Sequence, residues 1–223
     1  MSTLQVIVLV VAKAPEPGKA KTRLAKAVGD RAAAEIAAAA LLDTLDAVAD
    51  TPAAARVVAL TGDLDAACAS TEIRRRLDTF TVVGQRGDDF ADRLANAHAD
   101  AGATCAGLPV LQIGMDTPQV TAELLTTCAR ALSSAPAVLG PARDGGWWIL
   151  GLRDPAAAEY LRGVPMSRSD TGDLTAKALR DNGIQVAPVT MLTDVDIVDD
   201  VAGVRDVCDP ASRFAVATRT AGL

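Results

Sequence analysis

Apolar runs alternate with amphipathic stretches along most of the chain. Residues 6–11 form a continuous, largely β-branched apolar run, which is typical of a strand covered on both faces of a parallel sheet. From Asp30 to Val48 apolar residues recur at steps of three and four, and this spacing predicts a long helix that is capped by Asp30 and ended by Pro52. The same reasoning predicts strands at residues 6–11, 56–61, 79–84, 109–114, 137–140, 147–152 and 184–189, and further helices at residues 64–77, 90–101, 121–133, 170–182 and from 196 onward.

This order of elements indicates the class of fold. Strands that alternate with helices are typical of βαβ units in a mainly parallel sheet. The turn Asp144-Gly145-Gly146 between two apolar runs predicts an antiparallel hairpin in that sheet. We therefore expect an α/β protein built as a three-layer α/β/α sandwich, with a single domain over residues 1–223.

Composition excludes several classes of protein. The formal net charge is −6, which gives little long-range attraction to nucleic acid or to an anionic membrane surface. The apolar run near the N-terminus is too short to span a membrane and lacks the features of a signal peptide. The four cysteines lie far apart without a C-x-x-C pair, which argues against a zinc site. The chain has a single histidine, His98, which argues against His-based catalysis and against a His-rich metal site. We expect a cytoplasmic protein that binds neither nucleic acid nor membrane.

A basic loop, KAPEPGKAKTRL, follows the first predicted strand at residues 13–24. It carries four cations at the start of a helix, where backbone amides and the helix dipole favour an anion. The loop matches neither the Walker A pattern nor G-x-G-x-x-G. We predict that it binds the phosphates of a nucleotide, through Lys13, Pro15, Gly18, Lys21 and Arg23. A solvated basic loop is the alternative.

Two acidic motifs also follow predicted strands. Asp116 lies in IGMDTP after the strand at 109–114, and a carboxylate there is costly unless it meets water, a partner or a metal. Asp194 and Asp196 alternate in LTDVD, beyond the last strand. Because magnesium and similar ions take carboxylate oxygens together with substrate phosphates, we predict that Asp116 and Asp196 hold Mg²⁺ or Mn²⁺. Helix capping is the alternative role.

Further ligand contacts are predicted from glycine-rich and polar loops. Glycines in the segment GPARDGG permit a close approach to a ligand, and a plain hairpin turn is the alternative. Asp144 in that segment is the candidate for contacting an acceptor or acting as a base. The remaining predicted binding residues follow other strands or the same turn: Gln85, Gly114, Gly145 and Gly146.

Two adjacent tryptophans, Trp147 and Trp148, should point to opposite faces of their strand. One is expected in the core, while the other could stack on a base or a sugar.

These motifs resemble a bacterial group of glycosyltransferase-A-like proteins that is associated with arsenosugar biosynthesis or with radical-SAM enzymes. The resemblance covers residues 6–201 and rests on five ordered segments: AKAPEPGKAKTRL, QRGDDFADRL, IGMDTPQVT, LGPARDGGWWILGL and LTDVDIVDD. This chain has Ala91, Ile197 and Met166 where that group usually has Gly, Thr and Trp, and the last change bears on recognition of the acceptor. KAKTRL is also similar to phospholactate guanylyltransferases.

The resemblance implies a nucleotide-diphospho-sugar transferase fold and an enzyme of the transferase class. It implies metal-dependent transfer from a nucleotide sugar to a small-molecule acceptor, in which Lys21 and Arg23 neutralise the departing nucleoside diphosphate. Nucleotidyl transfer from a nucleoside triphosphate, with release of pyrophosphate, is the alternative reaction. A nucleotide-binding protein without catalytic activity is the third possibility.

Overall fold

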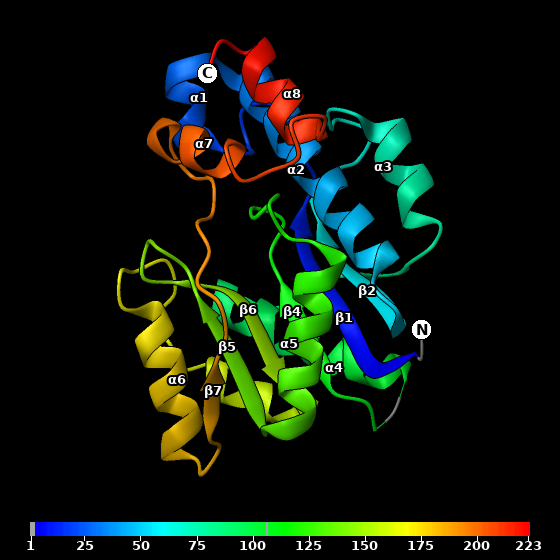
Figure 1. The fold of residues 1–223 in the computed structure, drawn as a ribbon, viewed down its shortest axis with the longest axis vertical. Coiled ribbons are helices and arrows are strands. Elements are labelled where there is room, and N and C mark those ends of the chain that lie inside the picture. The colour runs from blue at the N-terminus through cyan, green and yellow to red at the C-terminus, as the bar shows by residue number, and fades with distance from the viewer. Residues whose placement is uncertain (1–2, 106) are drawn as a thin grey trace.

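A computed structural model of the chain describes residues 3–105 and 107–223. Within them, one sheet of seven strands has the order β3-β2-β1-β4-β6-β5-β7 (Figure 1). All seven predicted strands are confirmed: β1 (Leu4–Lys13), β2 (Ala53–Thr61), β3 (Thr81–Gly84), β4 (Val110–Ile113), β5 (Ala137–Pro141), β6 (Trp147–Leu152) and β7 (Val186–Pro188). The last is shorter than predicted at both ends.

The direction of the strands determines where their loops gather. Strand β6 pairs antiparallel with both of its neighbours, β4 and β5, whereas the other pairings are parallel. The predicted hairpin is therefore confirmed as β5–β6. All strands except β6 end at one edge of the sheet, and the turn that connects β5 to β6 lies at that same edge.

Helices cover both faces of the sheet, which confirms the three-layer sandwich. One apolar core joins the sheet to α2, α3 and α5, and a second joins the other face to α4, α6 and a 3₁₀ helix, η1. The helices are α1 (Thr22–Val28), α2 (Asp30–Asp50), α3 (Ser70–Leu77), α4 (Phe90–Thr104), α5 (Ala122–Ser134), η1 (Pro155–Leu161), α6 (Thr171–Asp181), α7 (Val198–Arg205) and α8 (Arg213–Thr220). No described helix is both long and apolar enough to cross a bilayer.

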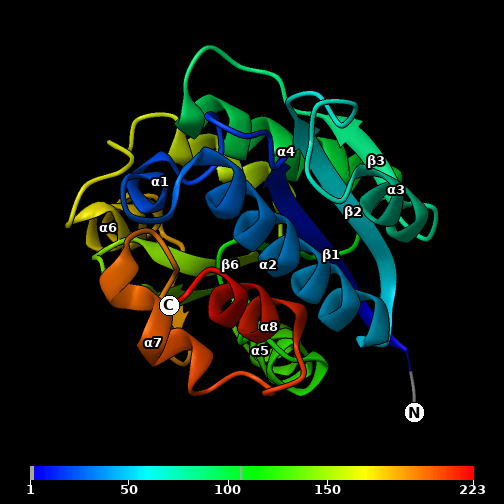
Figure 2. The ribbon, with the colours of Figure 1, turned by 90° about the horizontal axis from the view of Figure 1, so that it is seen from above.

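A third core packs the C-terminal helices against α1 and α2 (Figure 2). Phe214 of α8 is fully buried there. Arg213 holds the start of α8 to α2 through Asp43 at 3.3 Å and Asp46 at 2.6 Å. The end of the chain thereby covers the outer side of α2, the helix that follows the basic loop.

Several predicted boundaries were wrong for local reasons. Gly29, not Asp30, is the N-cap of α2, because its φ of +84° ends the unpredicted helix α1 and lets α2 begin at once. Helix α3 begins at Ser70 instead of residue 64, because Ala69 adopts a left-handed conformation with φ +53°. The final helical stretch opens with Ile197 as N-cap, so Asp196 lies just outside it.

Candidate functional site

A cleft of about 610 Å³ opens at the edge of the sheet where the parallel strands end. Its lining includes residues that follow β3, β4 and β5, among them Gln85, Gly114 and Asp144. Ligands of open α/β sheets bind outside the carboxyl ends of the strands, and the volume lies within the range of small-molecule sites. The basic loop and both acidic motifs of the sequence also line this cleft, through Lys13, Asp116 and Asp196 among others.

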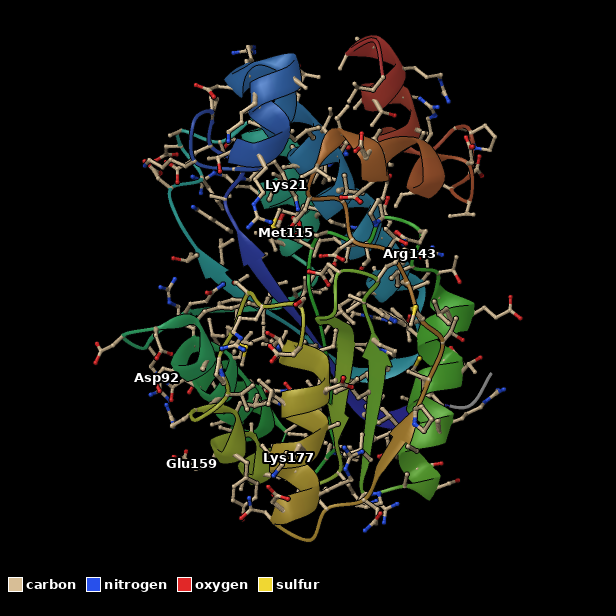
Figure 3. All side chains as sticks on the ribbon, turned by 90° about the vertical axis from the view of Figure 1, so that its left-hand side faces the viewer. Lys21, Asp92, Met115, Arg143, Glu159 and Lys177 are labelled. Carbon is tan, nitrogen blue, oxygen red and sulfur yellow. The ribbon has the colours of Figure 1, made fainter. Side chains whose placement is uncertain are left out.

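Lys21 lies between the two predicted metal ligands. Its Nζ is 2.9 Å from Oδ2 of Asp116 and 2.9 Å from Oδ1 of Asp196. Only 10% of the Lys21 side chain is exposed. Burial opposes its charge, but the two carboxylates outweigh burial and raise the pKa of Lys21 above its usual value. Figure 3 shows Lys21 beside Met115, the residue that precedes Asp116.

A backbone hydrogen bond brings the two aspartates together. The amide of Val195 donates to the carbonyl of Asp116 at 3.0 Å, so the segment after β7 lies against the end of β4. Since both carboxylates contact one ammonium nitrogen, their bonded oxygens are separated by at most twice 2.9 Å. Burial acts to raise the pKa of Asp196, but Lys21 and Arg23 outweigh it and hold that pKa below its ordinary value. A shared metal at Asp116 and Asp196 stays a prediction.

A second group of carboxylates lies next to this ion pair. Oxygens of Asp144, Asp194 and Asp196 lie within 4.8 Å of one another. Burial, followed by the charges of Asp144 and Asp196, raises the pKa of Asp194 to about 6. Three carboxylates at this spacing repel one another unless a cation or a proton intervenes. Hard divalent ions such as Mg²⁺ and Mn²⁺ prefer this all-oxygen donor set.

The hairpin turn that carries Asp144 is fixed on both sides. The amide of Gly146 donates to Oδ1 of Asp144 at 2.8 Å, and the amide of Arg143 donates to the carbonyl of Leu192 at 3.0 Å. This second bond joins the turn to the segment that carries Asp194. The turn therefore lies against another stretch of backbone.

Gly145 allows that turn to pack against the segment before α6. Its φ is +91°, and a Cβ there would lie 1.9 Å from the carbonyl oxygen of Ser169. The amide of Gly172 donates to the carbonyl of Gly145 at 2.8 Å. A larger residue cannot occupy position 145 without moving the turn or the start of α6.

The predicted phosphate loop divides into residues that reach the site and residues that do not. Lys13 and Arg23 line the cleft and also an adjoining pocket of about 250 Å³, which Lys19 and Lys21 line too. Pro15 is buried and accepts a hydrogen bond from the amide of Cys68, whereas Gly18 is exposed. Pro15 and Gly18 are absent from the walls of both the cleft and the pocket. The structure therefore does not place them with the lysines and the arginine of the basic loop.

Gln85 lines the cleft but already has partners. Its Nε2 donates to the carbonyls of Ala12 at 2.8 Å and Ala59 at 2.9 Å, which ties the ends of β1 and β2 to the residue after β3. Gly114 and Gly146 also line the cleft. The contacts of all three with a ligand stay predictions.

The two tryptophans face opposite sides of the sheet, as predicted. Strand β6 pairs Ile149 with Gly140 and Trp147 with Pro141, so the ladder skips Trp148. Such an irregularity re-aims side chains and is common beside functional sites. Trp148 is buried in the first core and donates to the carbonyl of Thr190 at 2.7 Å, whereas Trp147 packs against the second core. Both tryptophans line the cleft.

His98 is fully buried on α4, and its ring nitrogens have no hydrogen-bond partner among the described residues. Burial lowers its pKa to about 3. The ring is therefore neutral at ordinary pH, in agreement with the expectation of a non-catalytic residue.

Sequence reasoning underused two residues of the cleft. The pattern LTDVD pointed to Asp194 as well as Asp196, but alternation outside a strand does not fix which side chain faces the site. Gln112 of β4 interrupts the apolar run VLQIG. A polar residue at this position of a buried strand could have indicated a role for Gln112, but no role was predicted for it from the sequence.

The sequence of the chain matches one known family of proteins. Residues 44–168, more than half of the 223, match the family described as "Uncharacterized protein conserved in bacteria (DUF2064)". The chain belongs to this family. No curated protein matches it significantly.

Solved structures resemble this DUF2064 chain over nearly its whole length. A Desulfovibrio desulfuricans G20 protein, provisionally assigned as a nucleotide-diphospho-sugar transferase, is 26% identical with a TM-score of 0.85, over 99% of this chain and 95% of that one. A 4-diphosphocytidyl-2C-methyl-D-erythritol synthase is 12% identical with a TM-score of 0.59, over 94% and 100%. A manganese complex from Mycobacterium tuberculosis H37Rv is 20% identical with a TM-score of 0.54, over 90% and 97%.

These relatives confirm the nucleotide-diphospho-sugar transferase fold of the DUF2064 chain. The relative that is 26% identical also bears out the prediction of an enzyme of the transferase class. The resemblance given in the sequence is confirmed as far as the family and the fold, while the association with arsenosugar or radical-SAM chemistry stays a prediction.

Proposed function

We propose that this protein is a metal-dependent glycosyltransferase that moves a sugar from a nucleotide sugar to a small-molecule acceptor. The observation that carries the proposal is the meeting of a carboxylate cluster and a cationic loop at one cleft. Oxygens of Asp144, Asp194 and Asp196 lie within 4.8 Å of one another, and Lys21 and Arg23 both contact Asp196. Opposite charges arranged in this way suit a ligand made of phosphate and a divalent cation.

Asp144, Asp194 and Asp196 would hold Mg²⁺ or Mn²⁺. The fit rests on the donor set itself, because three carboxylates converge and the pKa of Asp194 is raised, first by burial and then by the charges of Asp144 and Asp196. A bound divalent ion supplies positive charge that stabilises the phosphates of the donor. In this arrangement Asp144 is a ligand of the ion, which replaces the role of base expected for it.

Lys21, Arg23 and Lys13 would bind the phosphates of the donor. Arg23 is two-thirds exposed and free to turn toward a ligand. Lys13 lines both the cleft and the adjoining pocket. During transfer an acceptor hydroxyl oxygen forms a bond to the anomeric carbon and gives up its proton to water, as the bond from that carbon to the phosphate oxygen breaks. The nucleoside diphosphate leaves with the electron pair, and preorganised cations stabilise its charge.

Nucleotidyl transfer is the second candidate, favoured by the basic pocket. The pocket of about 250 Å³ is lined by Lys13, Lys19, Lys21 and Arg23, which could hold the departing pyrophosphate of a nucleoside triphosphate. In that reaction an acceptor phosphate oxygen bonds to the α-phosphorus as pyrophosphate leaves. Release of pyrophosphate therefore separates the two reactions.

A thermal-shift screen tests the proposal. The purified chain is heated with nucleoside triphosphates, nucleoside diphosphates and nucleotide sugars, each with Mg²⁺, with Mn²⁺ and with EDTA. A ligand at about a hundred times its Kd stabilises the fold by about 2.7 kcal/mol, which gives a visible shift in Tm. We expect a nucleotide sugar to raise Tm only with a divalent ion. No shift with any nucleotide and either metal would overturn the proposal.

A further inference from the structure

Gln112 is a polar residue at an apolar position of the central strand β4. It pairs with Leu9 of β1 on one side and with Leu150 of β6 on the other, and both leucines are fully buried. Only 1% of Gln112 is exposed. An apolar side chain would pack with this row of the sheet at lower cost, so the glutamine needs another explanation.

The amide oxygen of Gln112 is buried next to the cleft without a partner in the described part of the chain. The residue lines the cleft, and its Oε1 is buried with no hydrogen-bond partner among the described residues. Buried carbonyl oxygens in native proteins are almost always paired, because an unpaired one destabilises the fold. An amide oxygen is an acceptor, so the missing partner is a donor group such as a hydroxyl.

The position of Gln112 in the sheet indicates which part of a ligand it meets. Strand β4 lies between β1, which leads into the cationic loop, and β6, which leaves the turn that carries Asp144. Gln112 thus lies beneath the middle of the cleft, between the proposed phosphate loop and the carboxylate cluster. Aromatic side chains flank the same hollow, namely Trp147 and Phe90, the latter 46% exposed. A neutral, hydroxyl-bearing group fits between apolar rings and an uncharged amide.

We infer that Gln112 is a specificity-determining residue whose amide, on turning toward the cleft, accepts a hydrogen bond from a hydroxyl of the sugar to be transferred. This inference rests on the proposed function and adds to it the residue that distinguishes the sugar from the rest of the nucleotide. Gln112 belongs neither to the basic pocket nor to the carboxylate cluster. Its effect is therefore confined to ligands that carry the sugar.

The test compares wild type with Gln112→Met, which keeps the length of the side chain and removes the amide. Calorimetry with Mn²⁺ gives Kd for UDP, UDP-glucose, GDP and GDP-mannose. In wild type each nucleotide sugar should have a lower Kd than its nucleoside diphosphate. Gln112→Met should reduce this ratio of Kd values at least tenfold while leaving Kd for UDP or GDP unchanged. The apo variant should melt no lower than wild type, because an unpaired buried oxygen has been removed.

Thr44→Val is the matched control. Thr44 is fully buried in α2 and its Oγ1 also lacks a partner among the described residues, but it does not line the cleft. Its variant should leave every Kd unchanged. If Gln112→Met keeps the wild-type gain from the sugar, the inference is wrong while the proposed function stands. If wild type binds none of the four nucleotides, the proposed function fails and the inference fails with it.

Discussion

Lys21 and Asp196 are separated by 175 residues in the sequence, yet the Nζ of the lysine lies 2.9 Å from Oδ1 of the aspartate. The same ammonium contacts Asp116, so one largely buried cation joins the loop after β1, the end of β4 and the segment after β7. Lys21 adopts a left-handed backbone conformation with φ +48°, which is uncommon outside glycine. Such local strain persists where surrounding contacts hold it, and it often marks functional sites.

Removing cations from this loop should weaken binding of nucleotides. Arg23→Ala should raise Kd for a nucleotide with Mn²⁺ about tenfold or more, because a charge-assisted hydrogen bond contributes about 1.5–3 kcal/mol. The fold should keep its stability, since Arg23 is 67% exposed and its pair with Asp196 at 3.4 Å is weak. Lys26→Ala, an exposed change on the same helix that lines neither hollow, is the control measured by calorimetry beside it. Equal Kd values for the two variants would make the loop a solvated basic segment.

Asp194→Asn and Asp116→Asn should have opposite effects on the apo protein. Asp194 is repelled by Asp144 and Asp196, so the amide relieves repulsion and Tm at pH 8 with EDTA should not fall. Asp116→Asn removes an ion pair to a lysine that is only 10% exposed, and Tm should fall.

Metal dependence separates the same two variants further. Asp194→Asn should abolish the rise in Tm that Mn²⁺ gives together with a nucleotide. An unchanged metal response in this variant would count against the carboxylate cluster as the metal site.

The unfolding free energy should decrease on acidification because of His98. Burial lowers its folded pKa to about 3, against an ordinary value of 6.5. Below pH 6.5 His98 binds a proton in the unfolded chain but not in the folded one. The contribution of His98 to the unfolding free energy is therefore lost as the pH falls from about 6.5 to about 3. The loss approaches about 1.4 kcal/mol per pH unit within that window. Urea unfolding of wild type and His98→Leu between pH 7.5 and 5 measures it, and the variant should show the shallower slope. Parallel slopes would mean that the ring is not buried and unpaired.

Gly145→Ala should disturb the carboxylate cluster from outside it. The added methyl would meet the carbonyl of Ser169 at 1.9 Å, and the φ of +91° is unfavourable for alanine. We expect a loss of about 2 kcal/mol or more in unfolding free energy, with weaker Mn²⁺ binding because Asp144 moves with the turn. Gly183→Ala is the control, since it has a similar φ of +79° but open space around its Cβ, and it isolates the cost of the backbone conformation. Equal losses in the two variants would show that the turn does not pack as closely as the structure indicates.

The sequence by itself determined the strands, the layers and the loops that carry polar residues, because these follow from hydrophobic periodicity over short stretches. It indicated the β5–β6 hairpin through Asp144-Gly145-Gly146 and placed Asp116 just after a buried strand. It misplaced the starts of α2 and α3, since a single residue with a positive φ, such as Gly29 or Ala69, decides where a helix begins.

Only the tertiary structure decided which charges meet. The amide of Val195 bonds to the carbonyl of Asp116, and the amide of Arg143 bonds to the carbonyl of Leu192, so three distant segments converge. These contacts put Lys21 between the two predicted metal ligands and add Asp144 and Asp194 to Asp196. Local patterns cannot specify such neighbours, because the distance between residues so far apart depends on the order of strands in the sheet and on the path of the loops at its edge.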